Sequence, residues 1–377
     1  MEAGPPGVVE SDRSRRWAAT MAGHRAPGLR TAHHDSTAVV GHHPPVAAYG
    51  RQDREEAQGT LADGATRAGG AGDRAVAEEP DPYRTCFERD RDRILHSSSF
   101  RRLAGKTQVF IFPADHQRTR LTHALEVAQV ATSVSRALRL NVALTEAVAL
   151  GHDCGHGPGG HASEDALDPY LPGGFDHAPW GATVSLAPLN LCAETTDGIA
   201  NHSWSRPAPA TPEGEVVSWA DRIAYVCHDW EDAVAAGVVS ASGLPDEVRQ
   251  RCGERRSAQL GAFIGALVRT AGTTGRIAMT AGMADALAAF RTYNYEHIYL
   301  RDASVAQARA VVGVLRGLVE YYADRPFAIP GHGEHPEVGA MQAAVTYVAG
   351  MTDRYAFRQA VAVLGWDPDK LPRGVDS

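Results

Sequence analysis

A chain of 377 residues is long enough to hold one large domain or two ordinary ones. Its formal net charge of −8 gives no global basic field of the kind that attracts nucleic acid. The five cysteines form no Cys-x-x-Cys pair, which argues against a disulfide framework or a zinc ribbon and indicates a reducing, cytoplasmic location. No apolar run approaches the roughly 20 residues that span a bilayer, so we expect no membrane association.

The first segment, residues 1–79, is rich in Ala, Gly, Pro and Arg and shows no apolar periodicity. Such a segment buries too little apolar surface to offset the entropy that it would lose on ordering. We therefore expect a disordered tail over 1–79, with order beginning near Pro80. Two regions are expected to follow, a core over 80–240 and a helical region over 241–377 that packs on it.

Two segments with different periodicities come next. The segment 107–112, Thr-Gln-Val-Phe-Ile-Phe, is the best candidate for a short strand and ends at Pro113. A long helix is predicted over 118–140, where Arg120 and His123 lie three residues apart and are neighbours on the helix surface. Apolar and small residues recur in this helix at three- and four-residue steps and predict its buried face: Leu121, Leu125, Ala128, Ala131, Ser135 and Leu138.

The stretch 151–161, Gly-His-Asp-Cys-Gly-His-Gly-Pro-Gly-Gly-His, lies between two predicted helices, 142–150 and 162–171. Adjacent His152 and Asp153 offer an imidazole and a carboxylate, a pair that suits a borderline or hard divalent cation. The glycines let the backbone turn sharply and lie close to a ligand. A metal site is therefore expected here, completed by ligands from elsewhere in the chain.

Helices account for most of the remaining sequence. A strong helix is expected over 213–236 and places Asp221, Tyr225 and Asp229 on one face, at positions i, i+4 and i+8. Beyond residue 245, helical runs are divided by breaks at 272–275, 301–302, 325–335 and 350. Because period-two alternation is scarce apart from the single strand candidate, the predicted fold class is all-α.

Four side chains complete a candidate ligand set. His123, the His152–Asp153 pair and Asp221 supply two imidazoles and two carboxylates, which suit Mn²⁺, Fe²⁺, Ni²⁺, Zn²⁺ or Mg²⁺. Four protein ligands leave octahedral positions for water and for a phosphate oxygen. An ion held in this way lowers the pKa of its bound water and draws charge off a phosphoryl group.

The chain resembles the HD-domain phosphohydrolases and, within them, the deoxyguanosine triphosphate triphosphohydrolases (dGTPases). The resemblance runs from about Asp90 to Asp229 and resumes near 349–356. Its motifs are Asp90-Arg-Asp-Arg-Ile-Leu-His-Ser, Phe100-Arg-Arg-Leu, Lys106-Thr-Gln-Val-Phe, Arg118-Thr-Arg-Leu-Thr-His-Ala-Leu-Glu-Val, His152-Asp-x-Gly-His, His161 with Glu164, Gly173-Gly-Phe-Asp-His, Asp221-Arg-Ile-Ala-Tyr-x-x-x-Asp and Ala349-Gly-Met-Thr-Asp-Arg-Tyr-Ala. The resemblance implies an HD-domain helical bundle over 80–240 with additional C-terminal helices.

The resemblance also implies an activity, namely hydrolysis of dGTP, or of deoxynucleoside triphosphates in general, to the deoxynucleoside and inorganic triphosphate. The roles that it implies are metal binding by His123, His152, Asp153 and Asp221, acid/base work by His161 and Glu164, triphosphate binding by Arg120, His156, His177 and Arg222, and sugar recognition by Gln108, Tyr225 and Asp229. Homo-oligomerisation and a nucleotide effector are further implications. We also expect weak binding of single-stranded nucleic acid.

Three departures from the family pattern bear on base preference and turnover rather than on reaction type. The loop after His156 reads Gly157-Pro-Gly where Pro-Pro-Phe is usual, which removes an aromatic side chain. Asp176-His-Ala stands where Glu-His-Asn is more familiar, so an amide is lost. The chain beyond Asp229 matches the family loosely, although 286–299 keeps its aromatic-rich helical character.

Two other functions remain open at this stage. A different HD phosphohydrolase, acting on a nucleoside monophosphate, a cyclic dinucleotide or an alarmone, could use the same four ligands. It would not need Gln108, Tyr225 and Asp229 together, so their presence disfavours it. A non-catalytic nucleotide sensor or single-strand binder would be favoured by a missing ligand or a missing His161–Glu164 pair, and the sequence contains them all.

Overall fold

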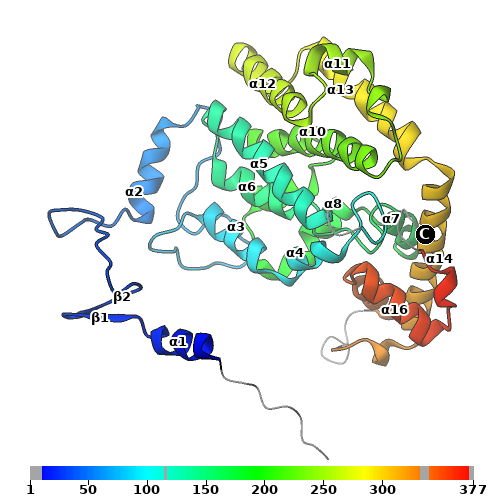
Figure 1. Cartoon of the computed structure of the whole chain (residues 1–377), viewed down its shortest axis with the longest axis horizontal. Coiled ribbons are helices and arrows are strands. Elements are labelled where there is room, and N and C mark those ends of the chain that lie inside the picture. Colours follow the sequence, from blue (N-terminus) through cyan, green and yellow to red (C-terminus); the bar gives the residue numbers. More distant parts are fainter. Residues whose placement is uncertain (1–10, 114–116, 332–338, 373–377) are drawn as a thin grey trace, which may run out of the picture. The chain divides into compact units, whose positions relative to one another are not determined.

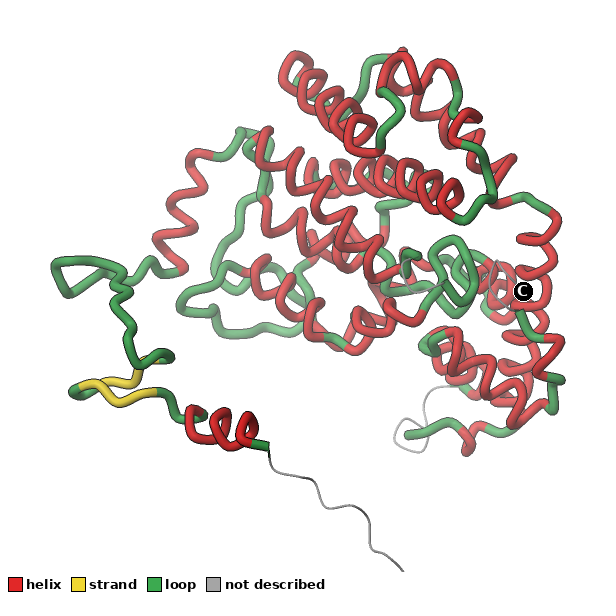
Figure 2. Tube along the Cα trace, in the orientation of Figure 1, coloured by secondary structure: helices red, strands yellow, loops and turns green. Residues whose placement is uncertain are grey.

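A computed structural model describes residues 11–113, 117–331 and 339–372 (Figure 1). The chain divides into two compact units, residues 1–49 and 50–377. Within the described residues, helices dominate and the sheet structure is a single two-stranded sheet, as Figure 2 shows in red and yellow. The all-α prediction is confirmed. In the described part of the chain, no helix combines the length and apolar character needed to cross a membrane.

The first unit contains a short helix and a hairpin. Helix α1 (Asp12–Thr20) begins after Ser11, whose hydroxyl oxygen accepts a hydrogen bond from the backbone N–H of Ser14 at 3.1 Å. Strands β1 (His24–Ala26) and β2 (Leu29–Thr31) pair antiparallel. The turn between them contains Gly28 at φ +71°, a conformation that glycine adopts at little cost.

The second unit holds the remaining helices. Their bounds are α2 Arg51–Glu56, α3 Cys86–His96, α4 Ser98–Arg102, α5 Arg120–Leu138, α6 Val142–Gly151, α7 Ala162–Leu167, α8 His177–Trp180, α9 Ala193–Ala200, α10 Pro212–Ala235, α11 Asp246–Cys252, α12 Arg256–Thr274, α13 Ala281–Asn294, α14 Asp302–Asp324, α15 Ala340–Ala349 and α16 Asp353–Leu364. The predicted helices over 118–140, 142–150 and 213–236 therefore correspond to α5, α6 and α10. All five cysteines are buried and free, as expected for a chain without a disulfide framework.

Residues 50–79 belong to the second unit, so the predicted tail boundary at residue 79 is wrong. Arg74 pairs with Asp90 of α3 at 2.6 Å, and the two side chains are only 1% and 0% exposed. Thr66 donates its backbone N–H and its hydroxyl to the carboxylate of Glu213 at 3.0 and 2.7 Å. Polar contacts of this kind leave no apolar periodicity in the sequence, and this explains why the segment resembles a tail.

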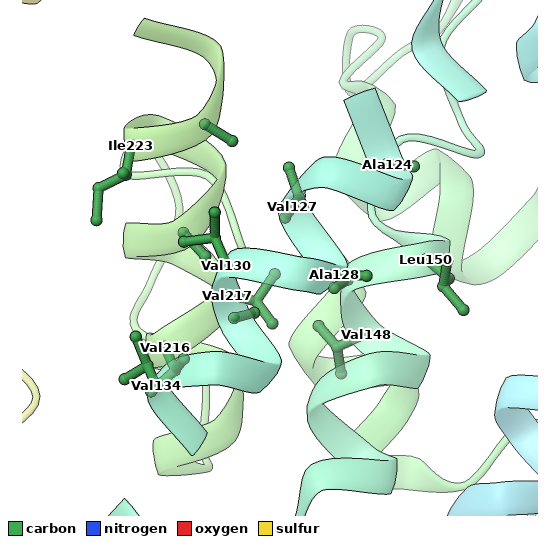
Figure 3. Close-up of a cluster of buried hydrophobic side chains, with 14 of the residues drawn as sticks. Ala124, Val127, Ala128, Val130, Val134, Val148, Leu150, Val216, Val217 and Ile223 are labelled. Atoms are coloured by element: carbon green, nitrogen blue, oxygen red, sulfur yellow. The ribbon is translucent and has the colours of Figure 1, made fainter. Parts of the chain in front are cut away.

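The main core forms where α5 packs against α6 and α10. Figure 3 shows small and branched aliphatic side chains of these three helices gathered in it: Ala124, Val127, Ala128, Val130, Val134, Val148, Leu150, Val216, Val217 and Ile223. The predicted buried face of α5 is confirmed at Ala128, Ala131 and Ser135 and is wrong at Leu125, which is 49% exposed. This packing brings the start of α5, the end of α6 and the interior of α10 together at one place.

Helix starts in this core follow from local capping. Asn141 accepts a hydrogen bond from the backbone N–H of Leu144 at 3.3 Å and so caps α6. Thr211 accepts one from the N–H of Gly214 at 3.1 Å and caps α10, whose first residue is a proline. The helices α6 and α10 begin within one residue of their predicted starts.

A second core joins α7, α14, α15 and α16. Its fully buried members include Val311, Leu315, Leu318 and Val345. The predicted breaks between the C-terminal helices are confirmed at Gly275, at 301–302 and at Gly350. The predicted break at 325–335 follows the end of α14 at Asp324, but its residues 332–335 lie outside the described part of the chain.

The predicted strand over 107–112 is wrong. Thr107 forms one isolated β-bridge with Thr119, and the described part of the segment has no partner strand. Phe112 has φ +51°, which a regular strand does not contain. The backbone N–H of Thr107 donates instead to Asp353 of α16 at 2.9 Å. Residues 107–111 of this segment instead line a cavity.

Candidate active site

Four predicted metal ligands converge where α5, α6 and α10 meet. His123 lies in the first turn of α5, His152 and Asp153 directly follow α6, and Asp221 lies within α10. The His123 Nε2 atom is 3.0 Å from Asp221 Oδ1, and the His152 Nε2 atom is 3.4 Å from Asp153 Oδ1 and 3.7 Å from Asp221 Oδ1. One donor atom each of His123, His152 and Asp153 lies within 4.8 Å of the others.

The orientation of the His152 ring indicates that this cluster fits a cation. Its Nδ1–H donates to the backbone carbonyl of Ala149 at 2.7 Å, so the lone pair of the neutral ring is on Nε2. That Nε2 atom is fully buried, points into the cluster and has no hydrogen-bond partner among the described residues. A buried lone pair of this kind costs free energy unless a ligand satisfies it. The nitrogen and oxygen donors fit a divalent metal ion.

Arg120, which was predicted to bind the triphosphate, lines the cavity but also binds the proposed metal ligand Asp153. Its guanidinium donates to Asp153 Oδ2 at 2.7 Å, and both side chains are 3% to 4% exposed. Burial disfavours ionisation of Asp153, but the positive charge of Arg120 holds the pKa of this carboxyl well below its usual value. Arg120 therefore fixes the carboxylate in its ionised state and leaves Oδ1 facing the histidines.

Glu164 holds two histidines at once. Its Oε2 atom is 2.9 Å from His161 Nδ1, and its Oε1 atom is 2.7 Å from His177 Nδ1. The predicted His161–Glu164 pair is therefore present, and the contact with His177 is an addition that the sequence did not indicate. Although burial opposes ionisation, hydrogen bonds from both imidazoles lower the pKa of Glu164. The side chain of His161 is 74% exposed, so its Nε2 atom remains available to a ligand.

His177 carries two protons in this arrangement. The Nδ1–H of His202 donates to the carbonyl of Ile199 at 2.8 Å, so His202 Nε2 is an acceptor, and it lies 3.3 Å from His177 Nε2. His177 must therefore donate from both ring nitrogens, one to His202 and one to Glu164. Burial opposes this charge, but Glu164 raises the pKa of His177. His156 stacks on His177 with ring centroids 3.7 Å apart.

A glycine allows this close arrangement. A Cβ atom added to Gly155 would lie only 1.9 Å from the backbone carbonyl oxygen of His177. The loop that carries His156 can therefore pack against α8 only with a glycine at this position. Two of the three histidines of the 151–161 stretch, His156 and His161, thereby come within 6.1 Å of the ring of His177.

The other end of the site joins α10 to the region around α13. The hydroxyl of Tyr225 accepts a hydrogen bond from Arg291 Nε at 2.8 Å, and the hydroxyl of Tyr299 donates to Asp229 Oδ2 at 2.6 Å. Burial raises the pKa of Asp229 to about 7. The second carboxylate oxygen of Asp229 and Oε1 of Gln108 are buried without a hydrogen-bond partner among the described residues. Two acceptors are thus left for a ligand.

One cavity of about 510 Å³ connects these groups. It is lined by every predicted site residue except His152 and Glu164, which lie behind its wall. The lining residues that sequence reasoning missed include His202, Trp204, Arg291 and Tyr299. The aromatic run over 290–299 was a signal for the last two. His202 and Trp204, which follow α9, had no comparable signal in the sequence.

Comparisons with known proteins agree with this geometry. Residues 120–226 match the HD domain, and residues 277–361 match the phosphohydrolase-associated domain. Three relatives are each called deoxyguanosinetriphosphate triphosphohydrolase-like protein. The relative from Caldanaerobacter subterraneus subsp. tengcongensis is 40% identical and is aligned over 75% of this chain and 86% of its own. The corresponding values are 40%, 74% and 86% for Clostridium perfringens and 38%, 74% and 87% for Desulfatibacillum aliphaticivorans.

Proposed function

Because the chain belongs to the deoxyguanosinetriphosphate triphosphohydrolase-like family of HD-domain phosphohydrolases, we propose that it hydrolyses a deoxynucleoside triphosphate to the deoxynucleoside and inorganic triphosphate. The observation that carries the proposal is the single cavity that joins three kinds of groups. A nitrogen-and-oxygen donor cluster lies at its base, cationic side chains line one part, and unsatisfied acceptors lie at the other end.

In this proposal, His123, His152, Asp153 and Asp221 hold a divalent cation. The bound ion would supply a water of lowered pKa and neutralise charge on the phosphate next to the sugar. Every donor of this set but Asp221 is at most 3% exposed, so the cluster is shielded from bulk water and its charges act at low local dielectric. Manganese, iron, nickel, zinc and magnesium all suit the donor set.

The triphosphate is proposed to lie along the positive groups of the cavity. His177 is doubly protonated by its two hydrogen bonds, and Arg222 presents a guanidinium to the same space. His156, which is proposed to contact the triphosphate as well, stacks on His177 with ring centroids 3.7 Å apart. Arginine can bind phosphate oxygens with two parallel hydrogen bonds, which suits Arg222 for orientation as well as for charge.

His161 is proposed to transfer a proton to the leaving 5′-oxygen. Water adds to the α-phosphorus, the bond from that phosphorus to the 5′-oxygen breaks, and the sugar oxygen must gain a proton. With Nδ1 held by Glu164, His161 can present Nε2–H to that oxygen. The ionised carboxylate stabilises the imidazolium that precedes this step.

Sugar selection is proposed to lie at the closed end of the cavity. The 3′-hydroxyl would donate to the free acceptor of Asp229 or of Gln108, which removes the cost of leaving these atoms unpaired. Tyr225, held by Arg291, would pack under C2′ of the sugar and leave no space for a ribose 2′-hydroxyl. A site of this type rejects a ribonucleotide by exclusion rather than by weaker hydrogen bonding.

Product identification tests the proposal directly. The purified protein is incubated with Mn²⁺ and with each of the four deoxynucleoside triphosphates, and with GTP as the ribose control, and the products are separated by ion exchange. We expect deoxynucleoside and inorganic triphosphate, with GTP unchanged. A monophosphate or diphosphate product would contradict the proposed reaction. Equal turnover of GTP and dGTP would contradict the proposed sugar selection.

A further inference from the structure

In the described part of the chain, Arg222 lines the cavity and stacks on an aromatic ring instead of pairing with a carboxylate. It follows Asp221 in α10 and is partly buried, yet within the described structure no carboxylate forms an ion pair or a hydrogen bond with it. Its guanidinium carbon lies 3.6 Å from the centre of the Trp204 ring. A cation above the face of an indole gains electrostatic attraction without using its N–H groups. The ring therefore compensates part of the burial cost and leaves those donors for a ligand.

Trp204 is itself fixed to the helix that carries Arg222. Its indole N–H donates to the backbone carbonyl of Ser218 at 3.1 Å, one helical turn before Arg222. Its ring meets Trp219 edge to face, with centroids 4.7 Å apart. The indole is thus held at one edge by a hydrogen bond and at another by an aromatic contact. A ring fixed in this way limits the directions that a stacked guanidinium can take.

We propose that Trp204 is a positioning residue that holds the Arg222 guanidinium over its ring so that the N–H groups of Arg222 face the triphosphate. The inference rests on the proposed function, because it takes the triphosphate as the ligand of Arg222. Both residues line the same cavity as His156, His161 and His177. Restricting the guanidinium before binding reduces the side-chain entropy that is lost when the anion arrives.

Binding of inorganic triphosphate, measured by isothermal titration calorimetry in the presence of Mn²⁺, tests this role without turnover. We expect Trp204→Leu to weaken binding by roughly ten-fold and Trp204→Phe, which keeps an aromatic face, to weaken it less. Trp366→Leu removes an indole outside the cavity lining and should bind as the wild type does. Circular dichroism and thermal unfolding verify that each variant is folded. Unchanged triphosphate affinity in a folded Trp204→Leu protein would overturn the inference.

An Arg222→Met background separates positioning from direct contact. If Trp204 acts through Arg222, then Trp204→Leu adds little to the loss that Arg222→Met already causes. The KM of Trp204→Leu should rise more than its kcat falls, and by a similar factor for all four deoxynucleoside triphosphates. A full additional loss in the Arg222→Met background, or an effect confined to one base, would show that the indole contacts the ligand itself and would refute the positioning role.

The two proposals fail in distinguishable ways. A wild-type protein that hydrolyses none of the nucleotides, but whose triphosphate binding depends on Trp204 as described, contradicts the proposed reaction and supports the inference. A wild-type protein that yields deoxynucleoside and triphosphate, but whose Trp204→Leu variant binds triphosphate as tightly, supports the reaction and removes the role of Trp204.

Discussion

The two oxygens of Asp153 serve opposite sides of the site. Oδ2 accepts from the buried guanidinium of Arg120, while Oδ1 lies 3.4 Å from His152 and 3.2 Å from His156. One carboxylate therefore joins the structural support of the site to its proposed ligand cluster. Loss of this side chain would remove a metal ligand and also leave a buried positive charge without its partner.

Asp153→Ala is accordingly expected to abolish Mn²⁺ binding and hydrolysis while helix content stays near that of the wild type. We also expect a loss of about 3–5 kcal/mol in the free energy of unfolding, because Arg120 becomes an unpaired buried charge. Calorimetric Mn²⁺ titration, product assays and chemical denaturation measure the three effects. Asp165→Ala changes an exposed aspartate of α7 and is the control. Full activity in Asp153→Ala would refute the ligand assignment.

Asp229 gives a pH-dependent prediction, because burial raises its pKa from 3.8 to about 7. Between these two pH values the folded state binds a proton that the unfolded state has released. The contribution of this group to stability is therefore complete below about pH 4 and is lost as the pH rises through about 7. Asp229→Asn keeps an uncharged group, and its carbonyl oxygen can still accept from Tyr299.

We therefore expect Asp229→Asn to match the wild type near about pH 4 and to exceed its free energy of unfolding by as much as about 4 kcal/mol near about pH 8. Denaturant titration across this range measures the difference. Asp285→Asn, at an exposed position of α13, should follow the wild-type curve at every pH. Parallel curves for Asp229→Asn and the wild type would show that the carboxyl does not titrate in this window.

The sequence predicted site residues only where they belong to a recognisable motif. His123, His152, Asp153 and Asp221 differ in position along the chain, but their residue types define a ligand set, and the structure brings them together. Arg291 contacts Tyr225 across 66 residues of sequence, and an arginine on a helix has no feature that marks such a contact. His202 likewise acquires its place only when α9 brings it against the rings of His152 and His177.

At the scale of elements, periodicity located the helices better than it located their faces. In α5, the predicted face included Ala128 and Ala131, which are buried, but also Leu125, which is exposed, and it left out the buried valines. The segment 107–112 has strand-like composition, but a strand also needs a partner, and none is present in the described structure. Composition reports local preference, and the partners that decide the outcome lie far away in the sequence.

The segment 107–112 is fixed instead by α16. Asp353 accepts the backbone N–H and the hydroxyl of Thr107 at 2.9 and 2.6 Å, and it also accepts the N–H of Gly159 at 2.9 Å. Lys106, whose pKa burial lowers to about 8, donates to the carbonyls of His156 and Ala349. The loops that carry Gln108 and His161 are thus both tied to one C-terminal helix.

Both carboxylate oxygens of Asp353 accept hydrogen bonds from these loops. In Asp353→Asn one oxygen is replaced by an NH₂ group, which cannot accept from the N–H that faces it, so we expect the loops to loosen. We expect the free energy of unfolding to fall by about 1–3 kcal/mol. The KM should rise while Mn²⁺ affinity is retained, because no proposed ligand contacts Asp353. Steady-state kinetics, calorimetry and denaturation measure these effects, with Asp285→Asn again as the matched substitution. A variant that loses Mn²⁺ binding but keeps its KM would contradict this account.

At the scale of the whole molecule, the cavity depends on both regions that match known domains. Its walls include Asp221 and Tyr225 from α10, within the part that matches the HD domain, and Ser304 and Gln307 from α14, within the phosphohydrolase-associated part. The sequence indicated a core and a C-terminal region as successive units. It could not show that the second supplies part of the wall, because this depends on the packing of α14 against α7.

The start of the second unit at residue 50 leads to the last prediction. A chain that begins at Gly50 should keep the wild-type thermal stability of the core, whereas one that begins at Pro80 loses Arg74 and leaves Asp90 buried without its cation. Removing one partner of a buried pair costs about 3–5 kcal/mol, so we expect the shorter chain to unfold at a much lower temperature.

Arg74→Met in the full chain isolates that ion pair from the other contacts of residues 50–79. It should reproduce a large part of the loss, whereas Arg67→Met, which changes an exposed arginine of the same segment that donates to backbone carbonyls, should cost much less. Calorimetric melting of the four proteins beside the wild type gives the comparison. Equal melting temperatures for the chains that begin at Gly50 and at Pro80 would return the boundary to residue 80, where composition alone had put it.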